Sequence, residues 1–177
     1  MRRFLFAVPP LIALSLFALA APARAEDRFF TYDPANNAAL LMTRGITLQA
    51  ERSLFTGVRV ERFFSTAGAG SADLDRDTLP GGTQAVLPAG ADESNVYRIE
   101  PGGHGAALSR ALCPGATSVW LVMGRVRPVR DLTIHAVGQG ATGQILLCHT
   151  MEYRYRGEWA APSAATPSAP GAPPPLR

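Results

Sequence analysis

The side chains best suited to bind a metal ion are two histidines and a methionine in the C-terminal part of the chain. His135, His149 and Met151 belong to two neighbouring segments in which apolar and polar residues alternate. Alternate residues of a strand share a face, and paired strands bring such side chains within reach of one another. Neutral imidazole and thioether groups suit copper. One interpretation is therefore a copper-type metal site; the other is that the histidines are interior or rim side chains and the methionine fills the core.

A small hydrolase is a weaker alternative. His104 stands in a glycine-rich turn just before Ser109, and Cys148 is followed directly by His149, so each pair could combine a nucleophile with a base. However, the sequence contains no G-x-S-x-G motif, and an oxidising compartment favours a disulfide over a free thiol. We therefore favour a protein that is not an enzyme, and we expect no cofactor apart from the metal alternative.

Three aspartates have the spacing of the first ligands of a calcium loop, at positions 73, 75 and 77. Such a loop needs glycine at its sixth position and glutamate at its twelfth, and this sequence has Thr78 and Gln84 there. The segment is therefore interpreted as a solvated acidic loop.

Residues 1–25 have the pattern of a secretory signal peptide. Arg2 and Arg3 precede an apolar run, and Ala23 and Ala25 provide the small residues that precede a cleavage site. We expect export to the periplasm or the extracellular space, cleavage after Ala25, and no transmembrane anchor in the mature chain. The sequence after Trp159 is rich in proline and alanine, so we expect residues 160–177 to form a disordered tail.

The two cysteines, Cys113 and Cys148, are expected to form a disulfide in an exported protein. The charge of the mature chain excludes one class of partner. All 17 basic residues are arginines, and removing the three in residues 1–25 leaves 14, which balance the 14 acidic residues. A neutral chain gives no reason to expect nucleic acid binding. An envelope protein or a peptide is a better candidate, and the C-terminal aromatic and arginine residues 153–159 are one possible contact surface.

Three successive strand patterns near the C-terminus are the strongest fold signal. Residues 118–124 are apolar throughout, as in a strand buried on both faces, and residues 131–137 and 144–156 alternate. A simple hairpin would place Ile134 opposite Cys148 and His135 opposite Leu147. The apolar positions are even-numbered in the second strand and odd-numbered in the third, which predicts a β-bulge between them.

Further strands are expected at residues 28–32, 46–50, 58–64 and 95–100, and short helices at 36–43 and 106–113, with an N-cap at Asp33 for the first helix. Residues 65–94 are expected to form a long surface connection. The sequence thus predicts a single α+β domain over residues 26–159, with a mainly antiparallel sheet of about six to seven strands and two short helices. The predicted function is that of a non-enzymatic envelope protein that acts by binding or structural support.

Overall fold

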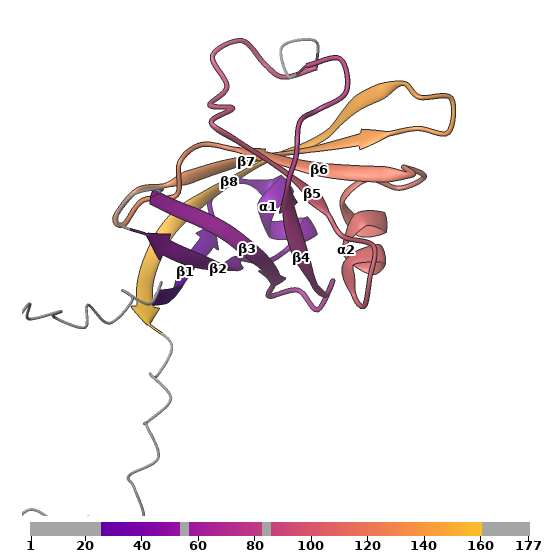
Figure 1. The fold of residues 1–177 in the computed structure, drawn as a ribbon. Helices are drawn as coiled ribbons and strands as arrows, with labels where there is room; N and C mark the ends of the chain where they lie inside the picture. Colours follow the sequence, from indigo (N-terminus) through magenta and orange to yellow (C-terminus); the bar gives the residue numbers. More distant parts are fainter. Residues whose placement is uncertain (1–25, 54–56, 83–85, 161–177) are drawn as a thin grey trace, which may run out of the picture.

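The fold is a closed antiparallel β-barrel (Figure 1). The computed structural model describes residues 26–53, 57–82 and 86–160. In this part of the chain, each strand pairs with its neighbours in sequence, and the last strand returns to pair with the first. The strands are β1 (Glu26–Pro34), β2 (Ile46–Ser53), β3 (Gly57–Ser65), β4 (Ser71–Arg76), β5 (Asn95–Ile99), β6 (Ser118–Met123), β7 (Leu132–Gln139) and β8 (Ile145–Ala160).

The predicted fold class, an α+β domain with a sheet of six to seven strands, is wrong. Two features close the sheet. First, β4 lies in the segment 65–94, which was expected to form a surface connection with at most one short strand at residues 83–87, of which 83–85 lie outside the described residues. Second, β8 is 16 residues long, so its first part pairs with β7 and its last part pairs with β1. Closure leaves no edge strand in this sheet, which removes the unpaired backbone groups that an open sheet presents.

The barrel interior is filled by side chains. Inward-facing residues alternate with outward-facing ones along each strand, and the inward set includes three tyrosines and several large aliphatic residues that are at most 1% exposed. An eight-stranded barrel is just wide enough for its own side chains to fill it. The largest of these fully buried residues are Phe30, Tyr32, Leu48, Phe63, Tyr97, Leu121, Met123, Ile134 and Tyr153.

Two short helices lie at one end of the barrel, which we call the helix end. The first, α1 (Asn37–Met42), joins β1 to β2, and the second, α2 (Gly105–Leu112), joins β5 to β6. The N-cap of α1 is Asn36, whose side chain accepts a hydrogen bond from Ala39. The expected cap at Asp33 is incorrect, because β1 continues through Pro34.

The α2 helix packs its apolar side into the helix end, where Leu108 and Leu112 are completely buried. Within the described ranges, no helix is long and apolar enough to cross a membrane. The opposite end of the barrel, which we call the open end, carries the connections β2–β3, β4–β5 and β6–β7.

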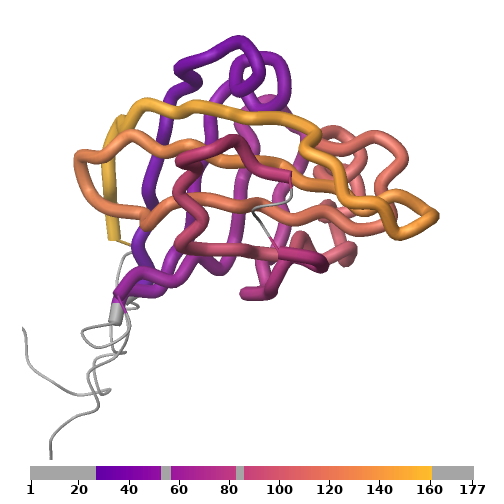
Figure 2. The backbone as a smooth tube through the Cα atoms, turned by 90° about the horizontal axis from the view of Figure 1, so that it is seen from above, coloured from indigo at the N-terminus to yellow at the C-terminus, as the bar shows by residue number. Residues whose placement is uncertain are grey.

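The β4–β5 connection lies across the outer face of the barrel (Figure 2). Leu79 from this connection packs with Trp120 and Val122 of β6 and Val137 of β7. The indole nitrogen of Trp120 donates a hydrogen bond of 3.0 Å to Asp77. Strand β6 is therefore buried on both faces, as its unbroken apolar sequence predicts.

The β7–β8 pairing contains the predicted bulge, but the predicted register is wrong. Ile134 pairs with Met151, and His135 pairs with Thr150. The register shifts between Ala136 and Val137, where Cys148 is the extra residue of β8. The bulge turns the odd-numbered apolar side chains of β8 to the same face as the even-numbered ones of β7.

The predicted disulfide between Cys113 and Cys148 is confirmed. Their Cα atoms are 5.5 Å apart, and the bond joins the C-cap of α2 to the bulge in β8. Gly138 of β7 leaves room for it, because a Cβ atom at this position would lie 3.1 Å from the Cys148 sulfur. The disulfide therefore fixes α2 to the helix end of the barrel.

Candidate functional site

Strands β3 and β4 separate toward the open end of the barrel. They pair only between residues 62–64 and 71–73, so the first residues of β3 and the last residues of β4 have no ladder contact with each other. The Val60 amide donates instead to the Tyr97 hydroxyl of β5, at 3.2 Å. This hydrogen bond reaches across the gap from the strand beyond β4 and satisfies a buried amide that the sheet leaves unpaired.

An arginine ends the inward-facing series of residues on β2 and on β4. On β2 the buried residues at 46, 48 and 50 are followed by Arg52, and on β4 Ala72 and Leu74 are followed by Arg76. Both arginines are exposed at the open rim. Arg28 holds the equivalent position on β1, where it forms an ion pair of 3.5 Å with Glu158 of β8. The rim of the barrel is thus more basic than the neutral mature sequence indicates.

The β6–β7 connection adds three more arginines to this end. Val126 is 5% exposed and packs with the barrel core, while Arg125 and Arg127 on either side of it are exposed. Together with the gap between β3 and β4, this loop forms a cavity of about 510 Å³, which we call the arginine pocket. Its lining residues are Gly57, Val58, Arg76, Ser94, Asn95, Arg125, Val126 and Arg127.

The loop that carries these arginines is held at both ends. At its start, the Asn95 side chain donates to the Gly124 carbonyl at 3.2 Å, and the Asp92 carboxylate accepts the Arg125 amide. At its end, the Asp131 carboxylate accepts the Tyr155 amide at 2.9 Å. The arginine side chains therefore extend from a backbone that is fixed before any ligand binds, which reduces the entropy lost on binding.

Two acidic residues close in sequence to the lining residues Arg76 and Ser94 already have other partners. Asp77 accepts hydrogen bonds from Trp120 and from the Thr78 amide, and Trp120 is the main reason that the pKa of Asp77 is below its ordinary value. Ser94 lowers the pKa of Asp92 in the same way. Both carboxylates thus stay ionised at neutral pH. Among the described residues, no carboxylate lies within ion-pair distance of Arg76, Arg125 or Arg127. Asp92 attracts Arg125 over a longer distance, so the guanidinium groups of Arg76 and Arg127 are the ones most available for an anion.

A second cavity of about 440 Å³ shares Arg125 with the arginine pocket. It lies between the β4–β5 connection and the outer face of β7, and its wall includes His135, Thr150 and Asp131. His135 is 4% exposed, its Nδ1 atom is 3.0 Å from the Thr150 hydroxyl, and burial lowers its pKa. This histidine is therefore neutral at pH 7.

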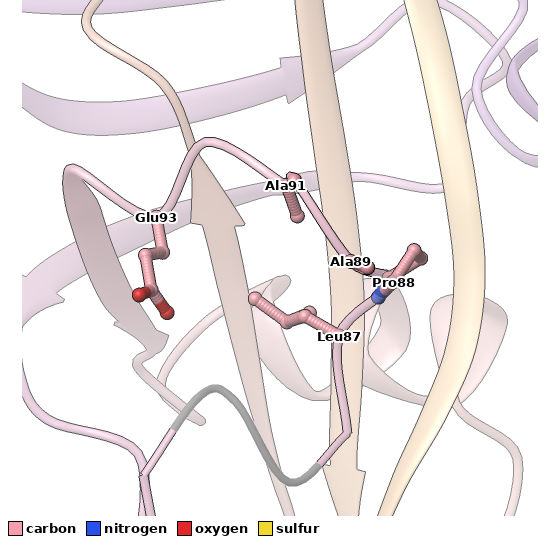
Figure 3. A pocket seen from close by; sticks show the side chains of 6 residues that line it. Leu87, Pro88, Ala89, Ala91 and Glu93 are labelled. Carbon is pink, nitrogen blue, oxygen red and sulfur yellow. The ribbon is translucent and has the colours of Figure 1, made fainter.

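A third and smaller cavity, of about 310 Å³, lies within the β4–β5 connection itself (Figure 3). Leu87 and Glu93 extend toward each other from the two arms of this connection, with Pro88 to Ala91 between them. Only one residue of its lining, Glu93, is charged, whereas three arginines line the arginine pocket. The arginine pocket is therefore the better candidate for binding a charged ligand.

The structure does not bring the predicted metal-binding residues together. Met151 is fully buried in the barrel interior, where the Tyr153 hydroxyl donates to its sulfur. His135 faces outward, because it pairs with Thr150, the residue next to Met151. His149 pairs with Ala136, one position further along. No group of three or more His, Cys, Asp or Glu side chains in the described ranges could hold a metal ion.

The residues of the hydrolase alternative are also dispersed. Cys148 is in the disulfide, so its sulfur is not a nucleophile. His104 is the N-cap residue of α2, and Ser109 lies five residues further along the same helix, on a different side. The aspartates of the calcium pattern lie on and just after β4, where Asp73 forms an ion pair with Arg62. A strand cannot wrap around a calcium ion as a loop does.

The predicted aromatic surface at the end of β8 divides between the two faces of the sheet. Tyr153 is buried in the interior, and Tyr155 makes an edge-on contact with Tyr32. Trp159 is 48% exposed and stacks on Phe29, with ring centroids 5.9 Å apart. The predicted signal peptide and the predicted tail lie outside the described residues, apart from Ala160, which ends β8.

The arginine pocket was missed at the sequence level, although one signal was present. Arg125, Arg127 and Arg130 fall within six residues, in the stretch between the predicted strands 118–124 and 131–137. The formal neutrality predicted for the chain after removal of residues 1–25 hid this local concentration. The contribution of Arg76 had no such signal, because β4 was not predicted and the packing of β4 beside the β6–β7 connection depends on closure of the barrel.

Comparisons of this chain with family models, with curated proteins and with solved structures find no match. The chemistry of the open end is therefore the basis for assigning a function.

Proposed function

We propose that this protein is an exported, non-enzymatic binding domain whose ligand is a small anion with phosphate or carboxylate groups, held in the arginine pocket. The observation that carries this proposal is the convergence of Arg76, Arg125 and Arg127 on one cavity in which no described carboxylate pairs with them. Guanidinium groups bind phosphate and carboxylate through paired hydrogen bonds of fixed geometry.

The shape of the cavity supports a small ligand. Its volume of about 510 Å³ is within the range of small-molecule sites. Besides the arginines, Asn95 and Ser94 provide polar groups, while Val58 and Val126 form an apolar floor. A ligand with one anionic end and a compact, less polar body fits this combination.

A filled interior supports a site at the rim. The residues that point into the barrel are large and almost completely buried, so they occupy the space that a ligand would need inside the barrel. The export of the protein rests on the sequence of residues 1–25 alone. The copper alternative has lost its geometric support, since His135 and Met151 lie on opposite faces of the sheet.

The test is calorimetric titration of the purified protein with inorganic phosphate and with citrate. We expect at least one of the two anions to bind, with an affinity that falls as the salt concentration rises, because exposed charges are screened. The double variant Arg76→Ala/Arg127→Ala should lose this binding. Each charge-assisted contact is worth about 1.5–3 kcal/mol, so the loss should exceed about 100-fold.

Arg110→Ala is the matched control, because Arg110 is an exposed arginine on α2 at the helix end of the barrel. It should bind both anions as the unmodified protein does. Equal binding by the double variant and by this control would show that the arginine pocket is not the site. The absence of binding of either anion to the unmodified protein would reject the proposed function.

A further inference from the structure

The most exposed large apolar side chain of the described residues lies beside the arginine pocket. Val129 is 79% exposed, and it follows Pro128 in the β6–β7 connection, two residues after Arg127. Its φ angle is 60°. A β-branched residue rarely adopts this left-handed conformation, and such strain persists only where the surrounding structure fixes the backbone. The hydrogen bonds that hold both ends of this loop provide that restraint.

Arginines surround this valine. Arg127 and Arg130 are exposed within two residues of it, and neither has a described carboxylate within ion-pair distance. The one acidic residue that directly follows, Asp131, holds the Tyr155 amide. Two exposed basic side chains thus flank a single exposed apolar side chain in the sequence of this connection.

A soluble anion would use the arginines but would gain nothing from an exposed valine. A membrane surface presents phosphate groups with an apolar layer directly beneath them, so it offers a partner to both kinds of side chain. Charge complementarity further selects a surface with anionic lipids, because each arginine near such a surface adds to the attraction.

We propose that the open end of the barrel docks onto a membrane surface that contains anionic phospholipids. In this arrangement the arginine pocket faces the lipid phosphates, and the Val129 side chain enters the layer below them. This inference rests on the proposed function, because it identifies the lipid headgroup as the source of the anion. The binding is peripheral and reversible, since one valine and a few arginines provide far less attraction than an inserted helix.

Sedimentation with lipid vesicles tests the inference. The purified mature protein, from which residues 1–25 have been cleaved, is mixed with vesicles of phosphatidylglycerol and phosphatidylcholine in equal parts, or with vesicles of phosphatidylcholine alone. We expect the protein to sediment with the anionic vesicles, to remain in solution with the neutral ones, and to be released by high salt. At about 1 kcal/mol per arginine, Arg76→Ala/Arg127→Ala should weaken vesicle binding about 30-fold.

Val129→Gly separates the apolar tip from the anion site. Glycine adopts a positive φ without strain, so this variant should fold at least as well as the unmodified protein. Vesicle binding should fall about twofold to threefold, because the apolar contact is lost, while phosphate and citrate binding should not change. Leu41→Ala is the matched control. Leu41 is 73% exposed on α1 at the helix end, so vesicle binding should be unaffected by its truncation.

The results distinguish the two proposals. Protein that binds phosphate or citrate in the arginine pocket but does not sediment with anionic vesicles would overturn the membrane inference and leave the proposed function intact. Equal vesicle binding by Val129→Gly and the unmodified protein would also overturn it. Vesicle binding that survives Arg76→Ala/Arg127→Ala would also overturn the membrane inference, because the arginine pocket would then not be part of the surface that binds the vesicles. The proposed function is rejected separately, by the titrations with phosphate and citrate.

Discussion

The helix end and the open end of this barrel differ in how completely their side chains are packed and paired. At the helix end, α1 and α2 cover the interior with buried leucine and alanine side chains, and the disulfide fixes α2 to β8. A buried polar group there also has a partner. Thr43, at the end of α1, is completely buried, and its hydroxyl lies 2.9 Å from that of Tyr153 on β8. This end is built for stability.

At the open end, several local features are unfavourable for the stability of the fold. Strands β3 and β4 separate, exposed arginines lie near one another, and Val129 adopts a positive φ. Like charges repel, and a left-handed valine is strained, so each feature lowers the stability of the fold. Such costs persist where they serve a function. The comparison indicates that the packing and the disulfide at the helix end offset the destabilising features of the open end.

Removing the disulfide should lower the free energy of unfolding more than the other substitutions described below. The Cys113→Ser/Cys148→Ser variant loses a link that spans 35 residues, and the chain-entropy model gives a loss of about 3–4 kcal/mol in the free energy of unfolding. Urea denaturation followed by circular dichroism measures this loss. The barrel should still fold, since its core is large.

A reducing agent provides the control for this variant. It should destabilise the unmodified protein by a similar amount and leave the double variant unchanged. A loss of less than about 1 kcal/mol would mean that α2 is held at the helix end by apolar packing alone, and the contrast between the two ends would be weaker than we describe.

The second prediction concerns the boundary between the two ends, where β3 and β4 separate. In Tyr97→Phe the buried Val60 amide loses the hydroxyl that accepts its hydrogen. An unsatisfied buried donor costs about 1–3 kcal/mol, so the free energy of unfolding should fall by that amount in the same urea assay.

Tyr155→Phe is the comparison variant, because the Tyr155 hydroxyl makes no hydrogen bond to a described residue and its ring is only half-buried. This variant should cost little. If Tyr97→Phe were equally harmless, the Val60 amide would have another partner, such as water, and the gap between β3 and β4 would be wetter than the hydrogen bond from Tyr97 indicates.

Local patterns identified most elements of the fold but not its closure. Alternation and apolar runs located most strands to within a few residues, and both helices are near their predicted positions. These signals depend on neighbouring residues. Whether β8 reaches β1 depends on pairing between segments more than 100 residues apart, and no local pattern encodes that pairing.

Strand β4, which was not predicted, shows a second limit of prediction from local sequence patterns. Its sequence, SADLDR, has only two apolar inward residues, Ala72 and Leu74, and three charged ones. The residues of β4 have low β-propensity, and the segment just before it is rich in glycine, so this sequence resembles that of a loop. In the structure, tertiary pairing with β3 and β5 overrides that weak preference.

The candidate site was predictable only in part, for the same reason. The arginines of the β6–β7 connection can be counted in the sequence, but the cavity exists because residues from β3, β4, β5 and that connection meet at one rim. The predicted set His135, His149 and Met151 failed to converge because the bulge at Cys148 changes the register. A bulge can be inferred from conflicting alternation, but its position sets which side chains share a face.

The last and smallest expected effect is a pH dependence at the open end. His135 is buried beneath the β4–β5 connection, and burial lowers its pKa. In the unfolded chain the same imidazole titrates near pH 6.5. As the pH falls below about 6.5, the unfolded state therefore takes up a proton that the folded state does not, and the free energy of unfolding decreases until the folded pKa is reached. One proton limits the slope to about 1.4 kcal/mol per pH unit.

Urea denaturation at several pH values between about 7 and 5 measures this slope. His135→Gln should remove most of it, while His104→Gln, at an exposed position in the turn before α2, should leave it unchanged. A slope that His135→Gln does not alter would show that the β4–β5 connection opens readily enough for His135 to take up a proton without unfolding, and the open end would then be looser than its hydrogen bonds indicate.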